Sequence, residues 1–160
     1  MDVLAEFGAG PAELDPDEAM TALLLAGDQA GAASLERANA LALEEVKVKR
    51  PGLIVWAAVL GRTAAVELIA DVGFDVNAKA RTDGPGTTEW ETALHHTARV
   101  GNLVLTRRLV ELGADPDQRD ERFGSTPLGW ARHFGQAELI AFLEPLTSPD
   151  PDAQSDPERR

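Results

Sequence analysis

The feature that most constrains the fold of this chain is a glycine that recurs at nearly regular intervals. Gly27, Gly61, Gly101 and Gly135 are separated by 34, 40 and 34 residues, and each follows a short apolar run. An apolar residue stands seven positions before each of them: Met20, Ile54, Leu94 and Leu128. Internal periods of roughly 20–50 residues are typical of solenoids, in which one small unit stacks on the next.

Each unit has the pattern of a short helix, a glycine turn and a second helix. Twelve residues after the first three glycines stand Asn39, Gly73 and Gly113. Asparagine and glycine adopt the left-handed conformation at low cost, so we interpret these positions as helix C-caps. The fourth unit ends at Pro145 instead, because proline stops a helix. The second helices carry apolar residues at steps of three and four, which favours amphipathic helices.

The third unit carries the most specific motif. It contains Thr92-Ala93-Leu94-His95, then Gly101-Asn102-Leu103, then Leu112-Gly113-Ala114-Asp115, and Thr126-Pro127-Leu128 repeats part of it in the fourth unit. This pattern and its spacing resemble the ankyrin repeat. The resemblance implies an all-α fold, namely an ankyrin-repeat solenoid of four helix-turn-helix units with short β-hairpin-like finger loops. It also implies a scaffold that binds other proteins.

The resemblance covers residues 15–146 and leaves both ends outside. We expect units of about 15–49, 50–89, 90–123 and 124–146. Gly84-Pro85-Gly86 lies in the longer connection between the second and third units, which predicts an enlarged finger from Lys79 to Glu91. We expect residues 1–14 to be a loose segment. Residues 147–160, rich in Pro, Asp and Ser, are expected to form a disordered acidic tail.

The adjacent histidines are the most chemically suggestive residues. Thr92 is the expected N-cap of a helix, and the resemblance implies that His95 is a hydrogen-bonding strut between that helix and neighbouring loops. His96 occupies the slot of Trp56 and Trp130, so we expect these three rings to stack in a column. An alternative is a groove wall or a contact that responds to pH. Adjacent histidines on a helix point about 100° apart and are poorly placed to bind one metal ion.

Composition and charge narrow the class of partner. The formal net charge is −12 with no cysteine, which disfavours nucleic acid and anionic lipid and favours a partner with a basic patch. The acidic N-terminus lacks the basic region of a signal peptide, and no apolar run is long enough to span a bilayer. We therefore expect a cytoplasmic, monomeric protein. The content of Ala, Gly, Leu, Asp and Arg suggests a bacterial source with a GC-rich genome.

No sequence motif for phosphate binding, nucleophilic catalysis or zinc binding is present. We therefore expect no catalytic residues, no cofactor and no metal. Asp115, Asp117 and Asp120 invite a metal interpretation, but the first matches the turn of the repeat, and we place the others on a solvated finger edge. One alternative is a regulatory or targeting module associated with an enzyme. A second is an enzyme that uses His95 and His96, which requires both rings in one open pocket.

The surfaces that repetition exposes are the concave side of the first helices and the fingers. Apolar residues just before the glycines mark candidate contacts on the concave side, and aromatic and arginine residues are common binding determinants on loops. For Trp90 the sequence leaves two alternatives, a plug that holds the enlarged finger or an anchor for a partner. The predicted partner-binding residues are Leu60, Arg99, Val100, His133 and Phe134 on the helices, and Trp90, Glu91, Arg122 and Phe123 in the fingers.

Overall fold

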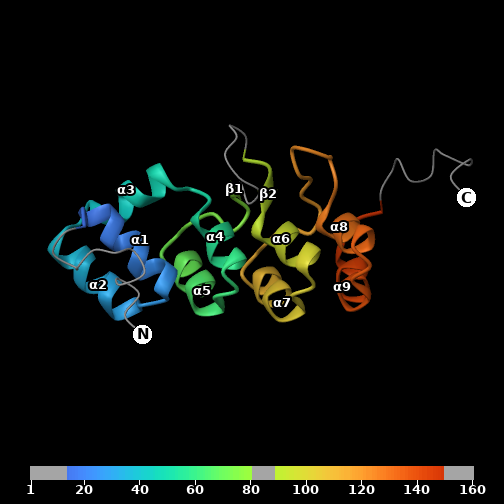
Figure 1. The fold of residues 1–160 in the computed structure, drawn as a ribbon, viewed down its shortest axis with the longest axis horizontal. Helices are drawn as coiled ribbons and strands as arrows, with labels where there is room; N and C mark the ends of the chain where they lie inside the picture. The colour runs from blue at the N-terminus through green and yellow to red at the C-terminus, as the bar shows by residue number, and fades with distance from the viewer. Residues whose placement is uncertain (1–13, 81–88, 150–160) are drawn as a thin grey trace, which may run out of the picture.

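The computed structural model describes residues 14–80 and 89–149, and these form a row of helix pairs (Figure 1). Each pair is joined by a tight turn at one of the recurring glycines, all of which have positive φ. The pairs are α1 (Pro16–Ala26) with α2 (Gln29–Ala38), α4 (Leu53–Val59) with α5 (Thr63–Asp71), α6 (Ala93–Val100) with α7 (Leu103–Glu111), and α8 (Pro127–His133) with α9 (Ala137–Leu143). A 3-10 turn, η2 (Glu144–Leu146), follows α9. The predicted all-α repeat architecture is confirmed.

Two layers of helices run along the row. In the inner layer α4 packs on α6 and α6 packs on α8, while in the outer layer α5, α7 and α9 follow one another. Leucine, isoleucine and alanine side chains fill the space between the layers, and Ile69, Leu105 and Leu109 are completely buried. Small aliphatic residues let the helices approach closely, which is how a chain with only 5% aromatic residues builds its core.

The segment between the first two pairs differs from the expected short finger. It folds as a further helix, α3 (Ala42–Lys49), which packs on α1 and buries Leu43 and Val46. Asn39 is the C-cap residue of α2, but its backbone is extended rather than left-handed. Alanine, leucine and charged residues after Asn39 have high helix propensity, and burial of an apolar face stabilises the extra helix.

One of the predicted fingers contains strands. β1 (Lys79–Ala80) and β2 (Glu91–Thr92) pair in antiparallel fashion, so the base of the enlarged finger is a small hairpin. The connection from α7 to α8 consists of turns and irregular backbone instead. Residues 81–88, the first thirteen residues and residues 150–160 lie outside the described part, and so does most of the predicted loose segment and tail. None of the described helices is long and apolar enough to cross a membrane.

A substitution at Gly101 tests how tightly neighbouring pairs are joined. The backbone of Gly101 has φ of 81°, and a Cβ atom there would lie 2.6 Å from Oε1 of Gln136. Gln136 donates a hydrogen bond to the carbonyl of Arg99 at 3.1 Å, which ties the last pair to the third. We expect Gly101→Ala to lower the free energy of unfolding by about 2–3 kcal/mol, from left-handed strain and the displaced hydrogen bond.

Gly61→Ala is the matched control. Gly61 is the equivalent turn residue with φ of 66°, but a Cβ atom added there would have no neighbour within 4 Å. We expect this variant to lower the free energy of unfolding by about 1–2 kcal/mol, from left-handed strain alone. Urea denaturation followed by circular dichroism measures both values. Equal losses for the two variants would contradict a role for Gln136 in joining the last two pairs.

Candidate functional site

His95 serves as a strut within the scaffold. Its ring is fully buried, Nδ1 lies 2.8 Å from the hydroxyl of Thr92, and Nε2 lies 3.0 Å from the carbonyl of Ser125. The amide of Thr92 also donates to Nδ1, which completes a capping box at the start of α6. Burial lowers the pKa of His95, so the neutral ring accepts at Nδ1 and donates from Nε2. The predicted link between the helix start and a neighbouring loop is confirmed.

His96 lies beside its neighbour in sequence but has a separate set of contacts. Nη2 of Arg99 donates to Nδ1 of His96 at 3.1 Å and to a carboxylate oxygen of Glu91 at 3.2 Å. His96 is 7% exposed, and burial together with the charge of Arg99 lowers its pKa to about 4. The two imidazoles therefore do not share one open pocket, which is the arrangement required by the enzyme hypothesis based on this pair.

The predicted column of Trp56, His96 and Trp130 is wrong as a continuous stack. Trp130 makes its ring contacts with aromatic residues of its own unit and of the fingers, and Trp56 is 45% exposed on α4. Equivalent slots do lie on neighbouring helices of the inner layer. However, two finger residues, Trp90 and Phe123, contact the ring of Trp130.

The densest group of rings lies at the end of the inner layer, and we call it the aromatic cluster. The rings of Trp130 and Phe134 are stacked, with centroids 5.6 Å apart and an interplanar angle of 13°. Phe123 packs edge-on against Trp130 at 5.4 Å and against Trp90 at 6.2 Å. The cluster comprises Trp90, Phe123, Trp130, His133 and Phe134. It joins residues from two fingers and one helix.

A buried carboxylate holds the cluster in place. Asp120 is 3% exposed, and its two oxygens accept four hydrogen bonds. The donors are the amides of Arg122, Phe123 and Ser125 at 2.9, 2.6 and 2.9 Å and the indole N–H of Trp130 at 3.0 Å. Burial alone would raise the pKa of Asp120, but these hydrogen bonds outweigh it and lower the pKa. The sequence interpretation placed Asp120 on a solvated edge and was wrong.

The predicted partner-binding residues separate into exposed and buried groups. On the helices Leu60, Val100 and Phe134 are 50%, 52% and 47% exposed, although they are apolar. The fingers add Phe123, which is 62% exposed, with the guanidinium of Arg122 lying 5.3 Å from the centre of its ring. His133, which contacts the ring of Phe134, is also exposed, and Arg99 is partly buried.

Trp90 and Glu91 were predicted to contribute to the partner-binding surface, but both are buried. Trp90 is 7% exposed and packs against Phe123 and Trp130, which does not suit an exposed anchor for a partner. Glu91 is completely buried in β2, where its carboxylate pairs with Arg99. Both side chains are buried, whereas the predicted surface requires them to be exposed.

A cleft that sequence reasoning did not identify lies between α1, α3 and α4. Its volume is about 420 Å³, and Trp56 and Leu60 form part of its wall. Lys49 of α3 and Arg50 lie at its edge, and both approach the carboxylate of Asp17, at 2.9 and 3.6 Å. The hydrogen bond from Lys49 lowers the pKa of Asp17. The cleft was not predicted because the sequence pattern gave a finger where the structure has α3, and Lys49 of α3 lines the cleft.

Comparison with known proteins identifies the repeat. A family model described as ankyrin repeats, in three copies, matches residues 54–154. The chain belongs to the ankyrin repeat family. This ankyrin repeat match includes α8 and the two finger residues of the aromatic cluster, Trp90 and Phe123. Across residues 14–80 and 89–149, no group of three or more His, Asp or Glu side chains is arranged to hold a metal ion.

Two known proteins are similar to part of this chain. The chain is 37% identical over 116 residues to "Ankyrin repeat and SAM domain-containing protein 6" of Danio rerio, covering 71% of this chain and 14% of that protein. It is 35% identical over 95 residues to "E3 ubiquitin-protein ligase Ufd4" of Drosophila melanogaster, covering 58% of this chain and 3% of that protein. The matched regions are thus small parts of these relatives. Both are animal proteins, so they give no support to the bacterial source that composition suggested.

Proposed function

We propose that this ankyrin repeat chain is a non-catalytic module that binds a protein or peptide through its concave face and fingers. The observation that carries the proposal is the exposed part of the aromatic cluster. Phe123 and Phe134 expose 62% and 47% of their surface although water-exposed phenylalanine is unfavourable. Exposed apolar residues that lie together mark interaction sites, and aromatic residues beside arginine are common binding determinants.

The rigidity of the cluster strengthens the proposal. Asp120, Trp90 and Trp130 hold the exposed phenylalanines from behind. A surface that is ordered before binding loses less side-chain entropy in a complex. We further propose that the module acts as a cytoplasmic monomer without cofactor, and that nucleic acid and membrane are not its partners, in line with its net charge of −12.

A comparative pull-down tests the proposed function. We expect the full chain, immobilised and exposed to lysate of its source cells, to retain one or more proteins in stoichiometric amounts. Phe123→Ser with Phe134→Ser should reduce their recovery at least tenfold, because central aromatic contacts contribute about 2 kcal/mol or more each. Quantitative mass spectrometry of the eluates measures recovery.

Val104→Ser is the matched control. Val104 is 74% exposed on α7, in the outer layer, so the variant removes an exposed apolar side chain away from the aromatic cluster. It should retain the same proteins as the unmodified chain. If both variants fold by circular dichroism and retain the same proteins equally well, the proposed binding surface is wrong.

A second candidate function is a regulatory or targeting module that acts with an enzyme. The observation that favours it is the similarity to part of a protein named as a ubiquitin ligase. In this case the same pull-down should recover a catalytic subunit in a stable complex, and activity in the eluate should depend on the phenylalanine pair. Recovery of non-enzymatic proteins alone would contradict this candidate and leave the binding function in place.

A further inference from the structure

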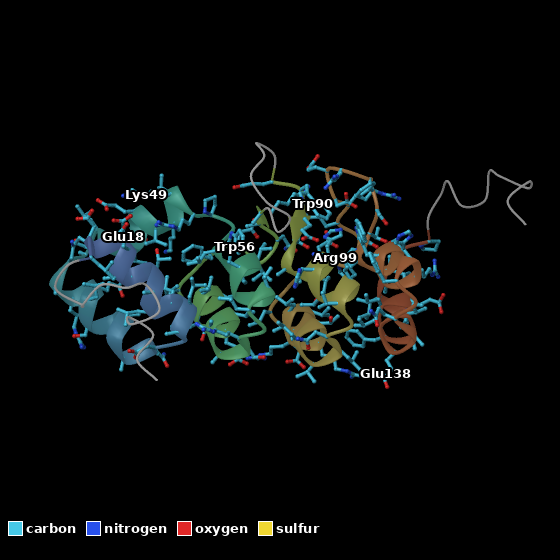
Figure 2. The ribbon with its side chains drawn as sticks, viewed as in Figure 1. Glu18, Lys49, Trp56, Trp90, Arg99 and Glu138 are labelled. Atoms are coloured by element: carbon cyan, nitrogen blue, oxygen red, sulfur yellow. The ribbon has the colours of Figure 1, made fainter. Side chains whose placement is uncertain are left out.

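The chain that follows α9 lies beside the connection between α7 and α8. Figure 2 shows Glu138, near the start of α9, at the edge of the array away from Trp90, so α9 runs toward the finger side. After η2, Thr147 donates two hydrogen bonds to the carbonyl of Leu143, from its amide at 3.0 Å and from its hydroxyl at 2.9 Å. Residues 147–149, which we call the strap, contain no helix or strand.

One carboxylate attaches the strap to that connection. Ser148 donates to Asp117 from its amide at 2.6 Å and from its hydroxyl at 2.5 Å, so each oxygen of the carboxylate accepts one hydrogen bond. The two residues are 31 positions apart in the sequence. Both bonds lower the pKa of Asp117, and the bond from the hydroxyl has the larger effect. The strap is therefore held by an ionised group that depends on the Ser148 hydroxyl.

Ser148 has the sequence context and the exposure of a kinase target. Proline-directed protein kinases act on serine or threonine followed by proline, and the chain contains Thr126-Pro127 and Ser148-Pro149. Ser148 and Pro149 are both exposed in the strap. By contrast, Thr126 is the N-cap of α8, where its hydroxyl accepts from the amide of Gly129 at 3.2 Å, and Pro127 is buried. Of the two, Ser148 is the one that reaches a kinase without disrupting a helix.

We propose that Ser148 is a regulatory phosphorylation site for a proline-directed kinase, and that a phosphate there releases the strap from Asp117. The serine oxygen forms a bond to the γ-phosphorus of ATP, and the bond from that phosphorus to the β–γ bridging oxygen breaks. ADP leaves, and the hydroxyl proton passes to the catalytic base of the kinase. Ser148 thereby loses the hydrogen that Asp117 accepts and gains about two negative charges beside a carboxylate.

The charges around the strap favour release of the phosphate over its retention. A cavity of about 740 Å³ borders the strap, and its charged lining residues are Asp117, Arg119, Arg132 and Glu144. Arg132 pairs with Glu144 at 2.6 Å, and Arg119 donates to the carbonyl of Gly124 at 2.8 Å while its charge lowers the pKa of Asp117. Two cations and two carboxylates cancel, so the lining has no surplus positive charge to hold a phosphate. Repulsion from Asp117 therefore decides where the strap lies.

Release of the strap opens one side of this cavity. Residues 147–149 form that side, whereas Leu128 and Gly129 of α8 belong to the rest of the lining. Leu128 is buried while the strap is attached, and detachment increases its contact with water. Phosphorylation thus changes the surface at the C-terminal end of the described array. This regulation does not depend on the proposed binding function, because it concerns contacts within the chain.

Phosphorylation of the purified full chain tests the site. We expect an activated mitogen-activated protein kinase, supplied with ATP, to add one phosphate to the folded chain. Fragmentation mass spectrometry should place this phosphate on Ser148, and Ser148→Ala should remain unmodified under the same conditions. Modification of Thr126 in place of Ser148, or no modification of the folded chain, overturns the inference.

Hydrogen exchange of the Ser148 amide, measured by NMR, tests the release of the strap. Phosphorylation should lower the protection of this amide by about threefold or more, a small factor because hydrogen bonds at the surface are weak. In Asp117→Ala the amide should be equally unprotected with and without phosphate, because its acceptor is missing. Asp115→Ala is the matched control, since Asp115 accepts from the amide of Asp117 and not from the strap, and it should respond to phosphate as the unmodified chain does. Protection that is unchanged by phosphate in the unmodified chain also overturns the inference.

Discussion

Asp120→Ala is expected to lower the free energy of unfolding by about 3–4 kcal/mol. The substitution removes the acceptor for three backbone amides and for the indole N–H of Trp130. A buried donor without a partner costs about 1–3 kcal/mol, and those near the surface recover part of this from water. The loop from α7 to α8 should lose its shape, and with it the support of Phe123. Urea denaturation measures the loss, and the fluorescence of Trp130 should shift to longer wavelength.

Asp115→Ala is the control for this prediction. Asp115 is exposed in the same connection, and its carboxylate accepts one hydrogen bond, from the amide of Asp117 at 2.9 Å. We expect Asp115→Ala to lower the free energy of unfolding by less than about 1 kcal/mol. The loss of unfolding free energy in Asp120→Asn should lie between those of Asp120→Ala and Asp115→Ala. An amide keeps one accepting oxygen but places a donor against the remaining N–H groups. A loss at Asp120 no larger than at Asp115 would show that the carboxylate does not organise the loop.

Asp120 also shows where sequence reasoning reached its limit. The helices followed from local information, because the glycine turns, the threonine caps and the apolar spacing all act within a few residues. His95 was correctly interpreted because its repeat slot defines its partners. The burial of Asp120 depends on a finger folding back toward α8, and the bond from Trp130 joins residues ten positions apart through that fold. Nothing in the local pattern distinguishes it from the exposed Asp115 and Asp117.

Part of the candidate surface could be predicted from the repeat pattern. Leu60, Val100 and Phe134 occupy one slot of the repeat, so their common exposure could be inferred from the period. Glu91 was misplaced because its burial requires a counter-ion, Arg99, on the next helix. The cleft beside Trp56 required knowledge of α3, where a helix replaces a repeat feature. Departures from the repeat are therefore where the structure adds most to the sequence.

The stability of the protein should fall by about 3 kcal/mol as the pH is lowered from 6.5 to about 4, through His96 alone. In the unfolded chain His96 takes up a proton near its ordinary pKa of 6.5, whereas in the folded protein its pKa is about 4. Between these values the unfolded state binds more protons, so acid favours unfolding. The contribution is complete above pH 6.5. It is lost progressively as the pH falls toward 4, where the folded state also takes up a proton.

His96→Leu separates this contribution from the others. Leucine cannot titrate and suits a position that is 7% exposed, so the variant should fold and should lose less stability between pH 6.5 and 4. Its residual loss arises from His95, whose pKa is also lowered by burial. The carboxyl groups with lowered pKa, such as Asp17 and Asp120, lose their contributions mainly below their ordinary pKa of 3.8, outside this range. Urea denaturation at several pH values compares the two proteins. Parallel curves for both would show that His96 is not held neutral by its burial and by Arg99.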